Sequence, residues 1–168
     1  MTGQLRLDRQ TTVAACQSLL AIEPLVALLD EDVKVVLRRS AAQPATRLIG
    51  VVDDAGRLVG VLPITRLAES VLARVVPEAL LADIEDVADV ARFGHAVEAR
   101  TAADVMVAPA WVSPDATIGE AFHLMHRLRL PGLYVVDKDG RPTGYLDLLE
   151  LAVAYVDGLE GRPPGPAV

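Results

Sequence analysis

The histidines of this 168-residue chain are the side chains whose type most readily suggests catalysis or metal binding. His123 and His126 lie three residues apart in a stretch with helical spacing, so both could face one metal ion. No carboxylate or cysteine stands beside them at a ligand spacing, and His95 has no partner motif. The glycines are single turn residues, so neither a Walker loop nor a dinucleotide fingerprint is present. The sequence therefore predicts no metal site and no enzyme activity.

Two short groups of residues that could bind a ligand each follow an apolar stretch of the sequence. Asp147 and Glu150 have the D-x-x-E spacing of a capping box, in which each side chain accepts a hydrogen bond from a backbone donor at a helix start. At the other place, Pro63 fits the first turn of a helix, and Thr65 and Arg66 offer a hydroxyl and a guanidinium that can hold a phosphate. The first set predicts a structural cap, whereas the second predicts either an anion site or solvated helix residues.

The elements that position these residues belong to a sequence repeat. Val51–Gly60 returns 84 residues later as Val135–Gly144, with six of ten positions identical. Each copy has the pattern of a hairpin, with an apolar strand, a turn rich in Asp and Gly, and a second strand. Helical patterns follow at Ile64–Val75 and at Leu148–Val156. A repeated unit of this size predicts two like halves packed on each other.

The remaining chain divides around these repeats. We predict a flexible arm over 1–9, a first half over 10–76, a connecting amphipathic helix within 77–100, a second half over 101–157, and a Pro/Gly-rich tail over 158–168. Further elements are predicted at 10–20 (helix), 25–29 (strand), 33–39 (helix), 111–113 (strand) and 118–128 (helix). The connecting helix, Glu78–Arg92, carries an apolar stripe that could cover its own sheet or that of a partner. Gly94 and His95 are predicted to form a loop after it.

Composition limits the possible partners and the compartment. A net charge of −7 argues against nonspecific nucleic-acid binding and against anionic membrane surfaces. The hydrophobic stretch Val13–Leu29 is broken by polar residues and proline, so no membrane insertion is predicted. Cys16 is the single cysteine, which excludes an intramolecular disulfide and predicts a buried, unreactive thiol. The first ten residues lack a signal-peptide pattern, so a cytoplasmic protein is expected.

A run from Ala103 to Gly144 carries a resemblance in order and spacing. It consists of Ala103–Met106, Val112–Thr117, Glu120, Ala121, Met125, Gly132–Asp137 and Gly140–Gly144. This pattern resembles a CBS domain, and two such domains in one chain form a Bateman module. The repeat and the resemblance together imply an α+β fold of two tandem β-α units, each a small mixed sheet covered by helices, related by pseudo-twofold symmetry. The resemblance also implies binding of adenosine-containing ligands and regulation of another protein.

The family's ligand signature is a Gly, a Thr or Ser three residues on, and an Asp six residues on. In the first half these places hold Pro63 and Arg66, and in the second half they hold Asp147 and Glu150, so neither half matches. Glu150 could still reach a ribose. Because Asp147 would repel phosphate, an uncharged nucleoside or a cationic compound such as S-adenosylmethionine suits the second half better than ATP.

The resemblance also implies an adenine pocket of apolar backbone. Its places in this chain are Val107, Ala108, Pro109, Leu133 and Tyr134 in the second half, and Leu25, Val26, Ile49 and Gly50 in the first. Tyr134 stands where the family commonly has proline. A tyrosine there could stack on a base or fill the pocket.

Three functions follow from these observations. The first is a stand-alone regulatory module that senses an adenosine-type ligand (AMP, ADP, ATP or S-adenosylmethionine), forms a homodimer through its helices and acts on a separate effector protein. The second is a ligand-free interaction module with degenerate nucleotide sites. The third, a cation sensor, rests only on the net charge and the acidic connecting helix.

Overall fold

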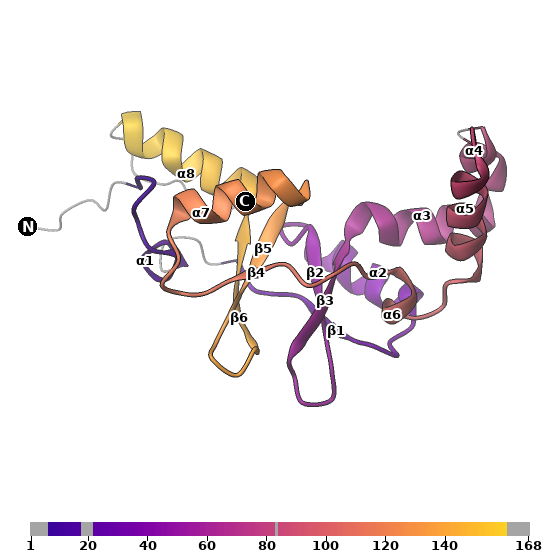
Figure 1. Ribbon diagram of the computed structural model, residues 1–168, viewed down its shortest axis with the longest axis horizontal. Helices are drawn as coiled ribbons and strands as arrows, with labels where there is room; N and C mark the ends of the chain where they lie inside the picture. The colour runs from indigo at the N-terminus through magenta and orange to yellow at the C-terminus, as the bar shows by residue number, and fades with distance from the viewer. Residues whose placement is uncertain (1–6, 18–21, 83, 161–168) are drawn as a thin grey trace, which may run out of the picture. The chain divides into compact units, whose positions relative to one another are not determined.

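The computed structural model describes residues 7–17, 22–82 and 84–160 and divides the chain into two compact units (Figure 1). Unit 2 is continuous from Leu25 to Pro109, whereas unit 1 combines the described residues before Leu25 with those from Ala110 onward. Parts of the predicted arm, first helix and tail, at positions 1–6, 18–21 and 161–168, lie outside the described residues. No helix within the described ranges is long and apolar enough to cross a bilayer.

Unit 2 contains a three-stranded mixed sheet and the helices α2 to α6. The strands are β1 (Val26–Leu28), β2 (Leu48–Val52) and β3 (Leu58–Pro63), and the helices are α2 (Val33–Ala42), α3 (Ile64–Val75), α4 (Pro77–Leu81), α5 (Val87–Glu98) and α6 (Ala102–Val105). The sheet order is β1-β2-β3, with β1 parallel to β2 and β2 antiparallel to β3.

Unit 1 repeats this sheet. Its elements are α1 (Val13–Gln17), β4 (Trp111–Val112), α7 (Ile118–Leu128), β5 (Gly132–Val136), β6 (Pro142–Asp147) and α8 (Leu148–Glu160). The order is β4-β5-β6, again with one parallel and one antiparallel pairing. The predicted α+β class with two small mixed sheets is therefore confirmed.

The turn of each hairpin explains why the repeat keeps Asp and Gly. The side chain of Asp53 accepts hydrogen bonds from the backbone N–H groups two and four residues ahead, at 3.0 and 2.9 Å. Asp137 does the same in the second hairpin, at 2.9 Å for both bonds. Gly56 and Gly140 adopt φ values of 76° and 78°, a region that residues with a Cβ rarely occupy. The shared residues are therefore those that close the turn.

The core of unit 2 lies between one face of its sheet and three helices. Ile49, Val51 and Leu62 on the strands pack against residues of α2, α3 and α6 in one buried cluster. The helical members are Val33, Val36, Leu67, Ala102 and Val105. Full burial of one such aliphatic side chain contributes about 1.5–3 kcal/mol. Because α6 supplies part of this core, the first sheet depends on residues that follow it by some forty positions.

A short helix precedes each repeat and packs in the unit that contains the other repeat's sheet: α1 packs in unit 1, and α6 packs in unit 2. The backbone N–H of Val13 in α1 donates to the carbonyl of Ala116 at 2.8 Å, within unit 1. Correspondingly, the N–H of Val33 in unit 2 donates to the carbonyl of Arg100, just before α6, at 2.9 Å. The predicted segments 10–76 and 101–157 follow the sequence repeat, whereas the compact units cross these boundaries.

The connecting segment forms two helices where a single helix over Glu78–Arg92 was predicted. Asp86 adopts an extended conformation and caps α5: its side chain accepts from the N–H of Asp89 at 2.9 Å, and the Asp89 side chain accepts from the N–H of Asp86 at 3.1 Å. This capping box starts a new helix, which continues through the predicted loop at Gly94 and His95 to Glu98. The part of the apolar stripe on α5 does not cover the chain's own sheet, because α5 has no buried residue.

Candidate functional site

The start of α8 in the second repeat is occupied by a protein side chain. Asp147 is fully buried, and its Oδ1 accepts hydrogen bonds from the N–H groups of Leu149 at 2.9 Å and Glu150 at 3.3 Å. Its Oδ2 accepts from the Tyr145 hydroxyl at 3.2 Å. The Asp half of the predicted capping box is thus present. Because its carboxylate uses the donors that a phosphate would need, this helix start does not favour an anionic ligand.

Two tyrosines fill the neighbouring sheet face. Tyr134 and Tyr145 pair across β5 and β6, both are almost completely buried, and their ring centroids lie 5.4 Å apart. A Cβ at Gly132 would stand only 2.3 Å from the Tyr145 hydroxyl and 2.5 Å from the Leu146 carbonyl oxygen, so only glycine fits there. Of the two roles considered for Tyr134, this packing favours filling the pocket over stacking on a base.

The equivalent helix start in the first repeat lacks a capping side chain. Pro63 is the N-cap residue of α3 and provides no side-chain hydrogen bond. Thr65 and Arg66 are exposed in the first turn, and the structure gives the Arg66 guanidinium no hydrogen bond or ion pair with any residue it describes. This end of α3 is therefore the more open of the two helix starts.

The residues predicted to surround adenine are divided between the two units: Leu133 and Tyr134 belong to unit 1, and the others belong to unit 2. Ile49 and Leu133 are fully buried in their own sheets, and Gly50 is buried within β2. Val107 forms backbone hydrogen bonds with Val61 of β3 at 2.8 and 3.1 Å, so it extends the sheet of unit 2 rather than that of unit 1. The predicted places that follow Val107 are exposed: they are Ala108 and Pro109.

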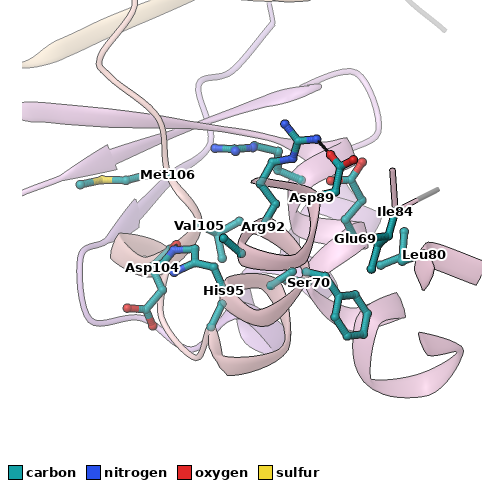
Figure 2. Close-up of a pocket in the computed structure, with 15 residues that line it drawn as sticks. Glu69, Ser70, Leu80, Ile84, Asp89, Arg92, His95, Asp104, Val105 and Met106 are labelled. Carbon is teal, nitrogen blue, oxygen red and sulfur yellow. Dashed lines mark hydrogen bonds and ion pairs between the residues drawn. The ribbon is translucent and has the colours of Figure 1, made fainter. Parts of the chain in front are cut away.

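A cavity of about 600 Å³ lies within unit 2, among α3, α4, α5 and α6 (Figure 2). Its apolar walls consist of side chains on α4, α5 and α6 or directly beside these helices. They are Leu80, Ile84, Ala91, Phe93, Ala96, Ala99, Val105 and Met106. Arg66 also lines the cavity, with Glu69 and Ser70 one turn further along α3. Of the residues predicted from the sequence as ligand-binding, Arg66 alone belongs to this lining.

The polar side chains that α5 contributes are held by one another. Arg92 forms an ion pair with Asp89, drawn as a dashed line in Figure 2. Asp89 also accepts from the N–H groups of Glu85 at 2.9 Å and Asp86 at 3.1 Å. The backbone hydrogen bond from Glu85 is the largest cause that lowers the Asp89 pKa, so this carboxyl group stays charged at neutral pH.

A second polar group lies where α5 meets α6. The Asp104 carboxylate accepts from the N–H groups of Arg100 and Thr101, both at 2.9 Å, and these bonds lower its pKa. His95 Nε2 lies 2.8 Å from the Asp104 carbonyl oxygen, so Nε2 carries the hydrogen and donates. Both helix ends that border the cavity are therefore fixed by hydrogen bonds.

Metal binding finds no support within 7–17, 22–82 and 84–160. No group of three or more His, Cys, Asp or Glu side chains there is placed to hold an ion. His123 and His126 are both exposed on α7. The burial of Cys16, at 0% exposure, raises the pKa of its thiol to about 11, as expected for a packing residue rather than a nucleophile.

Comparisons with known proteins agree with this architecture. Residues 102–157 match the family model of the CBS domain. The chain is similar to a CBS-domain-containing protein from Thermotoga maritima, at 23% identity and TM-score 0.69, over 88% of this chain and 95% of that chain. No curated protein matches.

Two further solved structures of similar fold contain ligands. One is CBSX2 in complex with AMP, at 19% identity and TM-score 0.64, over 88% of this chain and 97% of that chain. The other is the CBS domain pair of protein MJ0100 in complex with 5′-methylthioadenosine and S-adenosyl-L-methionine, at 16% identity and TM-score 0.60, over 90% and 96%. Residues 102–157 are therefore a CBS domain, and the chain has the fold of a CBS-domain pair.

Proposed function

We propose that this protein is a regulatory CBS-pair module that senses an adenosine-type ligand through unit 2 and acts on a separate effector protein. The ligand class comprises AMP, ADP, ATP and S-adenosylmethionine. The module works in the cytoplasm and contributes no catalysis of its own.

The observation that carries this proposal is the difference between the two repeats. In the second repeat, Asp147 takes the donors at the start of α8, and Tyr134 and Tyr145 fill the adjoining sheet face. In the first repeat, the start of α3 has no capping side chain, and the Arg66 guanidinium, which has no hydrogen bond or ion pair with a described residue, stands at a cavity large enough for a nucleoside-sized ligand. Unit 2 is therefore the sensing half, and unit 1 is the half whose site is closed.

Proteins of the same fold support the choice of ligand. CBSX2 has been seen with AMP, and the MJ0100 pair with 5′-methylthioadenosine and S-adenosyl-L-methionine. All of these compounds contain adenosine, which brings an apolar ring system and a ribose with hydrogen-bonding hydroxyls. A cavity with apolar walls and a few polar groups suits such a molecule.

Signalling requires that the ligand favour one arrangement of helices. Four successive helices, α3 to α6, border the cavity, so a ligand that contacts several of them can change their equilibrium positions, to the extent of its differential affinity for those positions. We propose that the output passes through a homodimer formed by the helices of unit 1. On α8, Leu149, Val153 and Val156 expose about half of their surface, at 54, 49 and 49%, and their spacing places them on one face.

A ligand-free interaction module is the second candidate. The filled site of unit 1 favours this candidate, because one of the two repeats already has protein side chains where a ligand would bind. Arg66 in that case is a solvated helix residue, and the exposed apolar side chains of α8 form the functional surface.

Thermal unfolding of protein stripped of carried-over ligand separates these candidates. The ligands are AMP, ADP, ATP, adenosine and S-adenosylmethionine, and the variants are Arg66→Ala, Glu150→Ala and, as a matched control on an exposed arginine outside the cavity, Arg38→Ala. At 100 times the Kd, one bound ligand stabilises by about 2.7 kcal/mol, which raises Tm by several degrees. A saturable shift that Arg66→Ala abolishes and Arg38→Ala keeps supports sensing in unit 2. If only Glu150→Ala abolishes the shift, the ligand binds in unit 1 instead. If no compound shifts the Tm, the result supports the interaction module.

A further inference from the structure

We propose that the outer face of α5, formed by Val87, Val90 and Gly94, is the surface on which the separate effector protein docks, and that it receives a basic amphipathic helix of that protein. This inference deepens the proposed function and rests on it, because it assumes that an effector exists. It states which surface the effector contacts and which chemistry the contacting segment has.

The two sides of α5 have different surroundings. Asp89 and Arg92 line the cavity and lie three residues apart, so they share one side of the helix (Figure 2). With about 3.6 residues per turn, Val87, Val90 and Gly94 lie on roughly the opposite side. Their spacing of three and four residues keeps them on one stripe. The outer face is therefore distinct from the wall of the cavity.

The outer face is apolar and open to solvent. Val87 is 84% exposed, which is the highest value among the large hydrophobic side chains of the described residues, and Val90 is 54% exposed. A Cβ added at Gly94 would meet no atom within 4 Å. Because the side chains of this stripe are small, a second helix can approach it closely. Exposed apolar side chains that share one helix face are typical of an interaction surface.

The charge around this face indicates the kind of partner. Residues 77–98 hold six acidic residues and one basic residue, so they carry a net charge of −5 out of −7 for the whole chain. Glu85 and Asp86 are exposed directly before the first turn of α5, beside Val87. A partner with basic residues around an apolar stripe complements both the charge and the apolar side chains.

The same charge argues against the other possible occupants. A second copy of the chain would place one segment of net charge −5 against another, and such juxtaposition of like charges is unfavourable. An anionic membrane or a nucleic acid would be repelled in the same way. A metal ion has no site there, since the described residues include no group of three or more His, Cys, Asp or Glu side chains placed to hold one.

Helix α5 connects this surface with the cavity. A ligand in the cavity contacts the inner side of the helix, and the effector contacts its outer side. A ligand that shifts the position of α5 therefore changes the affinity for the effector, and the effector changes the affinity for the ligand by the same factor.

The test is fluorescence anisotropy of the full chain with a labelled synthetic peptide. The peptide has the length of α5, 12 residues, and contains only leucine and lysine, with the leucines at helical spacing. One control peptide has the same composition with leucine and lysine alternating, which removes the apolar helix face, and another has glutamate in place of lysine. We expect the amphipathic basic peptide to bind at least about tenfold more tightly than either control.

Matched variants locate the binding. Val90→Gln should weaken the peptide about fivefold, because a half-exposed valine is lost from the contact. Its control is Val153→Gln on α8, where the valine is 49% exposed. Glu85→Gln should weaken binding about twofold and reduce its dependence on salt, whereas Asp54→Asn, at an exposed position in the turn after β2, should change nothing. All four positions are exposed or half-exposed, so circular dichroism should show folded proteins.

Four results overturn this inference. They are no binding of the basic peptide, equal binding of the control peptides, equal losses in Val90→Gln and Val153→Gln, and a change of oligomeric state by sedimentation in Val90→Gln, which would show that a second copy covers the face. The Tm shifts with adenosine compounds test ligand sensing separately. Peptide binding at α5 without any such shift supports the docking surface and overturns only the sensing function.

Discussion

Asp147 should be the polar side chain on which the C-terminal helix depends most, and Asp147→Ala tests this. The substitution removes the carboxylate that accepts from Leu149 and Glu150, a loss of about 1 kcal/mol for a helix cap. It also removes the acceptor of the buried Tyr145 hydroxyl. A hydrogen bond to a charged group contributes about 1.5–3 kcal/mol, and the long 3.2 Å separation here points to the lower value. The expected loss is therefore about 2.5 kcal/mol.

Chemical denaturation measured by circular dichroism provides the free energy, and thermal unfolding should show a Tm lower by about 5–10 °C. Glu150→Ala is the matched control, because the structure gives this side chain no hydrogen bond with a described residue; we expect it to cost less than about 0.5 kcal/mol. Equal losses for both substitutions would contradict a cap formed by Asp147 alone. A gain in stability for Asp147→Ala would show that the buried carboxylate is strained, and would turn the structural interpretation of this residue into a functional one.

Four further outcomes are expected. Gly132→Ala should destabilise the fold by about 1–3 kcal/mol in denaturant titrations, since the new Cβ would lie 2.5 Å from a backbone oxygen that cannot move freely. Gly94→Ala, inside α5 with open space around it, should instead raise stability by up to about 1 kcal/mol; a loss would contradict the helix there. The lowered pKa of Asp104 adds stability above its ordinary value of 3.8 that is lost as the pH falls below it, so the Tm deficit of Asp104→Asn should shrink between pH 7 and pH 3. Cys16 should resist alkylation in the native protein at pH 8 and react fully in denaturant, and rapid native labelling would show that α1 opens.

The elements that the sequence predicts correctly are those specified by neighbouring residues. The helix predicted at Ile64–Val75 and that at Ile118–Leu128 have the observed bounds. Thr117 begins the second of these with a capping box, and the Asp and Gly of each turn fix the hairpins. The sheet arrangement required the repeat as well, because strand pairing is not a local property.

The cavity could not be predicted, because its walls come from segments that tertiary packing brings together. Arg66 was identified from its place after the first hairpin, but Glu69 and Arg92 had no signal that linked them. One signal was available in the D-x-x-D pattern of Asp86 and Asp89, which marks the start of α5 and divides the connecting segment. Asp89, the second residue of this pattern, also lines the cavity.

Because unit 1 is discontinuous, the order of synthesis constrains how the protein assembles. The ribosome delivers all of Leu25–Pro109 before the residues against which α1 packs, so the apolar side chains of Val13 and Cys16 have no partner while unit 2 folds. The thermodynamic cost of closing so long a loop grows only slowly with its length, but the contact is necessarily late. An expression fragment that begins at residue 101 will contain the second sheet without the helix that covers part of it.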